Sequence, residues 1–165
     1  MGYGVKIKIG VISDTHLSQP SPDLFDLMGD VFSDVSIVFH AGDLTRISIL
    51  EAFSEKEVYA VSGNMDQHDV VDTLPSETVI KVGEYRIGLI HGWGSRDRVE
   101  GRVMGRFSGV DAIVYGHTHR PANHLKDNIL LFNPGAFSGS FISGKKHSVG
   151  VLSINDGLTG RIINI

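Results

Sequence analysis

The chain has 165 residues, a formal net charge of −4 at pH 7 and no cysteine, which excludes disulfides, thiolate metal sites and a cysteine nucleophile. A chain of this length predicts one domain, residues 1–165. Because the chain is acidic overall, we expect no broad basic surface of the kind that binds long nucleic acid. No apolar run approaches the ~20 residues that span a membrane, and the first residues turn polar too soon for a signal peptide, so we expect a cytoplasmic protein without a membrane partner.

Strands and helices are expected to alternate through the first two-thirds of the chain. Val5 to Ile12 reads as a buried strand, and Ser21-Pro22 predicts a helix start with Ser as N-cap and Pro at the first helical position. Further strands are expected at 35–39, 58–61, 79–82, 86–90 and 112–115, and further helices from near Asp43, carrying Ile47, Leu50 and Phe53, and from Ser95, carrying Val99, Val103 and Phe107.

Beyond His119 the pattern changes to short strands and turns. Strands are expected at 129–132, 148–154 and 159–164, with turn signals at 126–128 and 155–157 and a mobile Gly/Ser-rich loop at 138–144. Alternation of strands and helices, followed by a β meander, predicts an α/β fold of two packed, mainly mixed β-sheets flanked by helices. This architecture is a four-layer α-β-β-α sandwich.

Short polar fragments follow five of the apolar runs. Ligands bind at the carboxyl edge of strands in open α/β sheets, so we expect these polar side chains to converge there. Two carboxylates, four imidazoles and one amide are typical ligands for a pair of divalent metal ions. The seven candidate metal ligands are Asp14, His16, Asp43, Asn64, His91, His117 and His119.

Each fragment alone has a simpler interpretation. Asp43 could cap a helix, Asn64 could be a turn residue with positive φ, and His91 could be a core histidine. The Asp14-x-His16 spacing places both side chains on one side of an extended chain. The metal hypothesis depends on the occurrence of all five fragments, in order, at successive strand ends.

The order D-x-H, G-D, G-N, H, G-H-x-H resembles the signature of the calcineurin-like metallophosphoesterases, above all their small bacterial and archaeal phosphodiesterase branch. The segments 91–94 (HGWG) and 133–135 (NPG) fit that branch as well. The resemblance implies that Asp14, His16, Asp43 and His119 hold one metal and that Asp43, Asn64, His91 and His117 hold the other, with Asp43 bridging.

The resemblance also implies the reaction. A hydroxide that bridges the two metals would attack the phosphorus of a phosphodiester, and Asp14, Asp43, Asn64 and His91 would act in catalysis through the metals. Oxygen and nitrogen ligands fit two divalent transition-metal ions; we name Mn²⁺ first, with Fe, Co²⁺, Ni²⁺ or Zn²⁺ as alternatives.

One position departs from the family pattern. Many members carry a His after the Gly-Asn pair, which acts as an acid for the leaving group, and here that residue is Met65. A thioether has no proton to give. His68 is the candidate replacement, or else an exposed loop histidine. We expect Asp66 to support the site by hydrogen bonding and His40 to point away from the metals.

Other side chains carry two interpretations each. Trp93 either walls the site or packs beneath it. Arginines just beyond the fragments either hold phosphate or lie free on the surface. Three phenylalanines either form an apolar surface for a homo-oligomer or belong to the core. These residues are Arg46, Arg96 and Arg120, and Phe132, Phe137 and Phe141.

The function expected from the sequence is hydrolysis of a small phosphoester, with a phosphodiester preferred. A phosphomonoesterase or nuclease using the same site is one alternative. A catalytically weak protein-binding scaffold is another, because a subunit of the eukaryotic retromer coat is similar in fold. Retention of all seven ligand positions favours the enzyme. A zincin-type peptidase is not supported because no H-E-x-x-H occurs.

Overall fold

Two five-stranded sheets form the centre of the molecule in this computed structural model, which describes residues 6–138 and 147–165. The first sheet has the order β10-β9-β1-β2-β3. Strands β1, β2 and β3 run parallel, and β9 and β10 are antiparallel to their neighbours. The bounds are β1 Ile7–Ile12, β2 Ile37–His40, β3 Glu57–Ala60, β9 Ser148–Ile154 and β10 Leu158–Asn164.

The second sheet has the order β4-β5-β6-β8-β7. Strands β5, β6 and β8 are parallel, while β4 and β7 pair antiparallel at the two edges. The bounds are β4 Glu77–Val82, β5 Tyr85–Ile90, β6 Ala112–Val114, β7 Ala122–Lys126 and β8 Ile129–Asn133. Both sheets are therefore mixed, and each contains a run of parallel strands whose carboxyl ends can share one edge.

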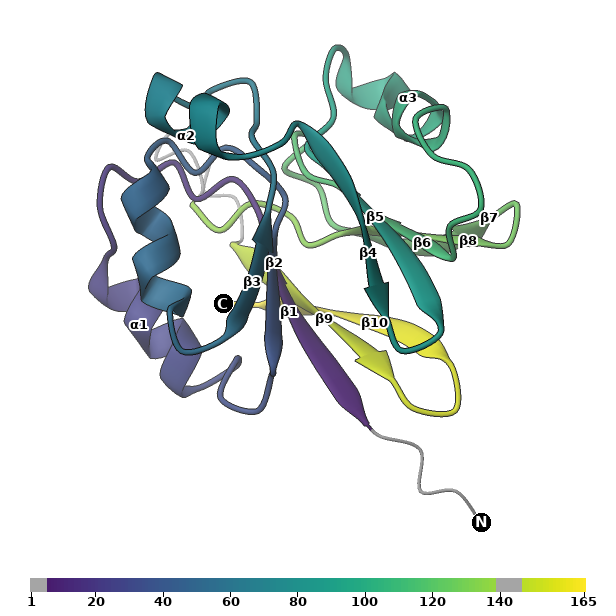
Figure 1. Ribbon diagram of the computed structural model, residues 1–165, viewed down its shortest axis with the longest axis horizontal. Coiled ribbons are helices and arrows are strands. Elements are labelled where there is room, and N and C mark those ends of the chain that lie inside the picture. The colour runs from purple at the N-terminus through teal and green to yellow at the C-terminus, as the bar shows by residue number, and fades with distance from the viewer. Residues whose placement is uncertain (1–5, 139–146) are drawn as a thin grey trace.

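Short helices cover the outer faces of the two sheets (Figure 1). Helices α1 and α2 lie beside the first sheet, where η1 contacts both, and α3 lies beside the second sheet. The bounds are α1 Pro22–Gly29, η1 Ile47–Phe53, α2 His68–Thr73, η2 Arg96–Arg98 and α3 Val99–Met104, where η denotes a 3₁₀ helix.

Successive side chains of a strand point to opposite faces of its sheet, and this alternation explains the layers of the sandwich. In β1, Ile9 and Val11 join the core between the sheets, whereas Ile12 joins the core under α1. In β6, Val114 faces the first core and Ile113 faces the core under α3. Each central strand is thus apolar on both faces, as expected where sheets are covered on both sides. The predicted four-layer sandwich of two mixed sheets is confirmed.

Several boundaries differ from expectation. The second helix begins at Ile47 and not near Asp43, because Asp43 and Thr45 have positive φ angles of 56° and 84°, which an α-helix cannot accommodate. Helix α3 ends at Met104, before Phe107, and Ser95 is the N-cap of η2 rather than of α3. Ser21 is the N-cap of α1, with Pro at the first position, as predicted.

Two elements were not expected. Strand β7 is an edge strand whose residues are almost all exposed, and α2 is a helix of six residues with one buried side chain, Val70. Neither carries the apolar periodicity that reveals an element from sequence. The predicted loop at 138–144 lies almost wholly outside the described residues, as do Val5 and Phe141. Phe132 and Phe137 belong to the core, with 0% and 7% exposure, so they offer no surface for association.

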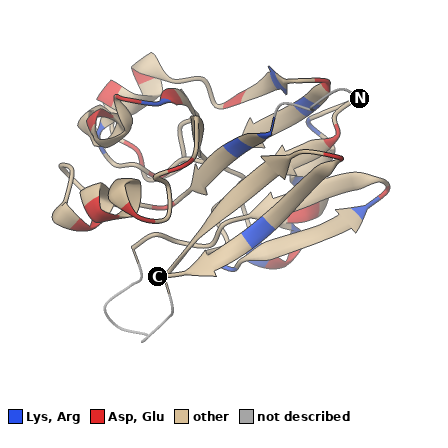
Figure 2. Cartoon of the chain, turned by 90° about the horizontal axis from the view of Figure 1, so that it is seen from below, with Lys and Arg blue, Asp and Glu red and all other residues tan. Residues whose placement is uncertain are grey.

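Charged residues are scattered over the elements rather than gathered on one of them (Figure 2). Among residues 6–138 and 147–165, no helix is long and apolar enough to cross a membrane. The cytoplasmic location and the homo-oligomer stay predictions.

Candidate metal centre

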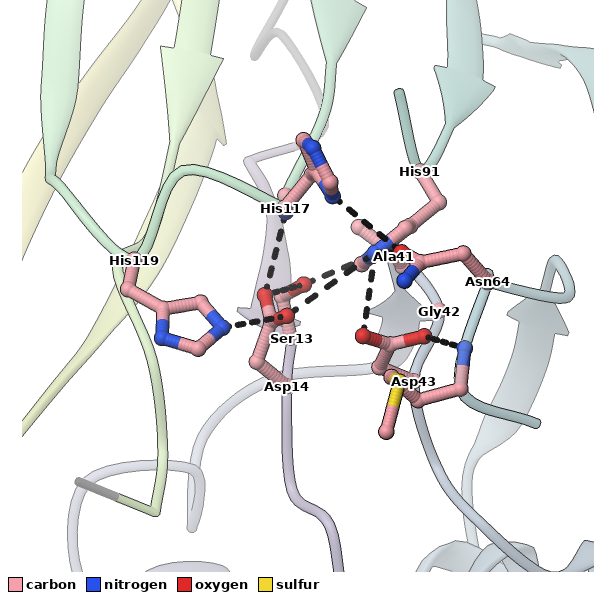
Figure 3. Close-up of polar contacts among 12 residues, drawn as sticks. Ser13, Asp14, Ala41, Gly42, Asp43, Asn64, His91, His117 and His119 are labelled. Atoms are coloured by element: carbon pink, nitrogen blue, oxygen red, sulfur yellow. Dashed lines mark hydrogen bonds and ion pairs between the residues drawn. The ribbon is translucent and has the colours of Figure 1, made fainter. Parts of the chain in front are cut away.

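All seven predicted ligands lie just beyond the carboxyl ends of parallel strands. Three of these strands, β1, β2 and β3, belong to the first sheet, and β5 and β6 belong to the second. Packing of the two sheets brings their loops together at one edge, and the six predicted ligands labelled in Figure 3, which are all but His16, lie around a common centre. The site is therefore built across the sheet–sheet interface.

The backbone at this edge is unusual. Five of the seven residues have left-handed φ angles between 46° and 66°, and they are Asp14, His16, Asp43, His117 and His119. Non-glycine residues rarely adopt this conformation, and strained residues of this kind concentrate at functional sites. The extended Asp14-x-His16 geometry expected from the sequence is wrong, because both residues lie beyond β1 and turn left-handed. Asn64, expected as a positive-φ turn residue in its simpler interpretation, is not among the residues with positive φ.

The first half of the cluster centres on Asp14. Its Oδ1 lies 3.0 Å from Nε2 of His119 and 3.6 Å from Nε2 of His16. The same His16 nitrogen lies 3.7 Å from Oδ2 of Asp43. Ligand atoms of Asp14, His16 and His119 are thus close enough to share one metal ion.

The second half centres on His91 and Asn64. Nε2 of His91 lies 3.2 Å from Oδ2 of Asp43 and 3.1 Å from Oδ1 of Asn64. Nδ1 of His117 lies 3.1 Å from the same Asn64 oxygen. His91 Nε2 is also 3.9 Å from Oδ1 of Asp14, so the two halves adjoin, with Asp43 facing both.

The hydrogens of the two histidine rings show which of their nitrogens can bind a cation in this half of the cluster. Nδ1 of His91 is 2.7 Å from the carbonyl oxygen of Ala41, and Nε2 of His117 is 2.8 Å from that of Gly94. Each of these nitrogens donates its hydrogen, because a carbonyl oxygen only accepts. In the neutral rings, the opposite nitrogens are then bare lone pairs, and they face the oxygens of Asn64 and Asp43. Such a set of acceptors is suited to binding a cation.

Charge in the cluster follows from its burial. Burial opposes ionisation of Asp14, but hydrogen bonds with His119 and His16 outweigh it and hold the pKa of Asp14 well below its usual range. Burial likewise opposes charge on Asp43, whose pKa is nevertheless lowered by His91. The carboxylates in turn raise the pKa of His16, through Asp14, and of His91, where burial acts in the opposite direction. In the metal-free cluster, the carboxylates therefore favour the protonated forms of these two rings.

Asp66 holds the Asp43 loop in shape, as predicted. Its carboxylate accepts hydrogen bonds from the backbone N–H groups of Gly63, Thr45 and Asp43, at 2.7, 2.6 and 3.1 Å. Burial raises its pKa despite these donors. A Cβ at Gly63 would lie 2.2 Å from Oδ1 of Asp43, so only glycine allows the β3 loop to approach this closely.

Asn133 supports the loop of His117 and His119, a role that sequence reasoning did not assign. Its Nδ2 donates to the carbonyl oxygen of Gly116 at 2.9 Å and to Oγ1 of Thr118 at 3.0 Å, while its Oδ1 accepts from the N–H of Gly135 at 2.9 Å. The side chain is fully buried. The sequence feature that could have revealed this role is a polar residue at the end of the apolar run of β8.

His40 lies behind the ligands, as expected. It is fully buried, and burial lowers its pKa to about 3. Its Nδ1 accepts from the N–H of Gly42 at 3.2 Å, so Nε2 carries the hydrogen and faces Oγ1 of Thr15 at 3.2 Å. This neutral ring connects two of the ligand loops without pointing at the metal position.

The remaining candidates lie outside the cluster. His68 is exposed at the start of α2, and in the described part of the chain it makes no hydrogen bond or ion pair. Met65 is 61% exposed, and its backbone N–H donates to Oδ1 of Asp43 at 2.8 Å. Nη1 of Arg46 lies 4.0 Å from the buried Oδ1 of Asp69, and Nη1 of Arg120 lies 3.9 Å from Oδ1 of the exposed Asp97. Arg96 is exposed.

The fold is a two-sheet α/β sandwich, and a cluster of carboxylates, imidazoles and one amide lies at the strand ends. This combination of fold and site is typical of metal-dependent hydrolases. The family model described as "Calcineurin-like phosphoesterase superfamily domain" matches residues 7–157. The chain belongs to this superfamily, whose members use divalent metals.

Curated relatives agree with this assignment. A probable metallophosphoesterase of Methanocaldococcus jannaschii is 37% identical over 98% of this chain and 83% of its own length. A phosphodiesterase of the same organism is 26% identical over 81% of this chain and 86% of its own length.

Solved structures share the fold. One, described as a novel archaeal phosphodiesterase, has a TM-score of 0.74 at 23% identity and covers 96% of this chain and 100% of that one. Another, a Vps29 protein of Entamoeba histolytica complexed with Zn²⁺, has a TM-score of 0.72 at 24% identity, with 96% and 99% covered. At these identities the likeness establishes the fold alone.

Proposed function

We propose that this protein is a phosphodiesterase dependent on two divalent metal ions, with Mn²⁺ favoured and Fe, Co²⁺, Ni²⁺ or Zn²⁺ as alternatives, and that residues 1–165 form its single domain. The observation that carries the proposal is the convergence of lone pairs from Asp43, Asn64, His91 and His117, with His91 and His117 hydrogens turned away. Such an arrangement fits cations bound by oxygen and nitrogen.

Two ligand sets are proposed. Asp14, His16, Asp43 and His119 would hold one ion, and Asp43, Asn64, His91 and His117 would hold the other. When bound, two such ions acidify a water molecule near neutral pH and act as Lewis acids toward the phosphoryl oxygens. Two carboxylates against two dications leave the centre with a positive charge, which favours a phosphate ester anion as substrate.

The protein's own residues supply position. Ala41 and Gly94 fix the rings of His91 and His117 through carbonyl oxygens, which orients the metal-facing nitrogens before any ion arrives. Asp66 fixes the Asp43 loop. Because His68 makes no contact with the cluster, its assignment as general acid receives no support, and the leaving group has no acid assigned to it.

The scaffold alternative is less well supported. Vps29 neighbours share the fold. In this chain, however, all seven predicted ligand positions carry side chains that can bind a metal, and these side chains converge and contact one another. A phosphomonoesterase or nuclease would use the same donors, and substrate preference decides between these and a phosphodiesterase.

The test begins with protein stripped by a chelator. Mn²⁺, Co²⁺, Zn²⁺ or Mg²⁺ is added back, the bound metal is counted by elemental analysis, and hydrolysis of bis(4-nitrophenyl) phosphate is compared with that of 4-nitrophenyl phosphate. We expect two ions per chain and a preference for the diester. His119→Gln should lose an ion and most activity, while His124→Gln should lose neither, since His124 pairs with Glu100 away from the cluster. One ion or none, or no hydrolysis with any metal, would refute the proposal.

A further inference from the structure

A groove opens next to the second half of the metal centre. It has a volume of about 420 Å³, and Asn64 and His91 line one end of it. Trp93, Glu77 and Arg106 also line it. A substrate whose phosphate lies at the metal centre would place one of its two ester groups near this groove.

The wall of the groove is held rigidly. Trp93 is 43% exposed although it is a large aromatic side chain. The backbone around it accepts three hydrogen bonds: Nε of Arg102 donates to the Trp93 carbonyl at 2.8 Å, His117 donates to the Gly94 carbonyl at 2.8 Å, and Arg102 donates to that of Ser95. The candidate ligand His117 and Trp93 are therefore joined through one short segment, whose backbone is fixed beside the groove.

The charges in the groove cancel each other. Nε and Nη2 of Arg106 donate to both carboxylate oxygens of Glu77, at 2.9 and 2.6 Å. Arg106 holds the pKa of Glu77 below its usual range, and both groups are charged at neutral pH. A bidentate pair of this kind uses the guanidinium edge that would otherwise bind an anion. The groove thus combines a partly exposed aromatic residue with a charge pair whose net charge is zero.

We propose that this groove is the subsite for one ester group of the substrate and that it selects a flat, uncharged aromatic group over an anionic one. The inference rests on the proposed phosphodiesterase function. Trp93 would stack on the ring, and the Glu77–Arg106 pair would set the charge preference. The pair acts on specificity, since removing Glu77 leaves Arg106 free to attract an anion.

The experiment compares two symmetrical diesters, bis(4-nitrophenyl) phosphate and bis(4-carboxyphenyl) phosphate. Each carries the same substituent on both ester groups, so the outcome does not depend on which one enters the groove. The readout is the ratio of kcat/KM for the carboxylated diester to that for the nitro diester. Intrinsic reactivity cancels when this ratio is compared between variants.

We expect Glu77→Gln to raise the ratio about fivefold, the size of one partly exposed ion pair. Arg106→Gln should lower it, because the Glu77 carboxylate then repels the substrate carboxylate, and the double variant should return near the wild-type ratio. Asp34→Asn removes one exposed negative charge, which pairs with Lys8, and should leave the ratio unchanged. Trp93→Ala should raise KM for the nitro diester about fivefold, and Trp93→Phe should restore it.

Two results would overturn the subsite. One is a ratio that a folded Glu77→Gln protein leaves unchanged. The other is a KM that Trp93→Ala leaves unchanged. Absence of hydrolysis of both diesters by the wild-type protein with every metal would instead refute the phosphodiesterase function. Thermal unfolding of each variant shows that the comparison is made between folded proteins.

Discussion

Nε2 of His91 lies 3.2 Å from Oδ2 of Asp43, although the two residues follow strands of different sheets. His91 follows β5, and its Nδ1 is held by the carbonyl of Ala41 beyond β2 of the other sheet. The geometry of the metal centre is therefore set by how the two sheets pack. Three experiments address the ligands and their support, and a fourth addresses the leaving group.

Asp43→Asn should lower metal occupancy and turnover together. The substitution removes the negative charge that faces both halves of the cluster, whereas the backbone N–H of Met65 can still bond to the Asn oxygen. We expect fewer than two ions per chain and a loss of activity greater than roughly 100-fold, beyond what outer partners of ligands typically cost. His40→Gln is the control: it should retain both ions, because His40 bonds Gly42 and Thr15 and not the metals. Normal hydrolysis by a folded Asp43→Asn protein would contradict the ligand assignment.

Protons should begin to displace the metals at a pH above the ordinary pKa of histidine. The pKa values of His16 and His91 are raised above 6.5 in the metal-free protein by the neighbouring carboxylates. Metal ions must displace these protons, so apparent affinity falls as pH falls and begins to fall above pH 6.5. Calorimetric titration with Mn²⁺ from about pH 8 to about pH 5.5, which brackets the reference histidine pKa of ~6.5, measures this. A constant affinity over that range would show that these rings are not ligands.

Asn133→Ala should destabilise the protein and weaken metal binding together. It leaves the buried carbonyl of Gly116 and the N–H of Gly135 without their side-chain partner, at a cost of about 1–3 kcal/mol in the free energy of unfolding. Urea unfolding with a chelator present measures this cost. Asn123→Ala is the matched control, since Asn123 donates a single hydrogen bond to Gly160 on the surface, and surface substitutions stay within about 0.5 kcal/mol. Equal effects of the two substitutions would remove the supporting role from Asn133.

Met65 should make the enzyme depend on good leaving groups. A positioned acid typically contributes ~10²–10⁴-fold to the expulsion of a poor alkoxide, and no acid among the described residues contacts the cluster at this position. We expect kcat/KM across substituted phenyl esters to fall steeply as leaving-group pKa rises, and Met65→His to flatten that dependence. A flat dependence in the wild type would mean that another acid acts, and His68→Gln would then be the first variant to test.

The positions of most strands and the convergence of the candidate ligand loops were predictable from the sequence, because apolar runs end in polar fragments at each parallel strand. The left-handed backbone of Asp14 and His16 was not, since it depends on hydrogen bonds to Gly42 and Asp43 on a neighbouring loop. The groove was also hidden, because Glu77 and Arg106 are 29 residues apart and meet only after folding. Helix α2 and strand β7 carry too little apolar periodicity to be recognised.

The five left-handed ligand residues have a consequence for engineering. Each carries a backbone penalty of order 1–3 kcal/mol, which glycine would not incur at the same φ. Replacing His119 or His16 by glycine would remove this penalty, but it would also remove a partner whose hydrogen bond keeps the buried Asp14 carboxylate ionised. The backbone strain is therefore tied to the same side chains that hold Asp14 in its charged form, so stability and function constrain one another at these backbone positions.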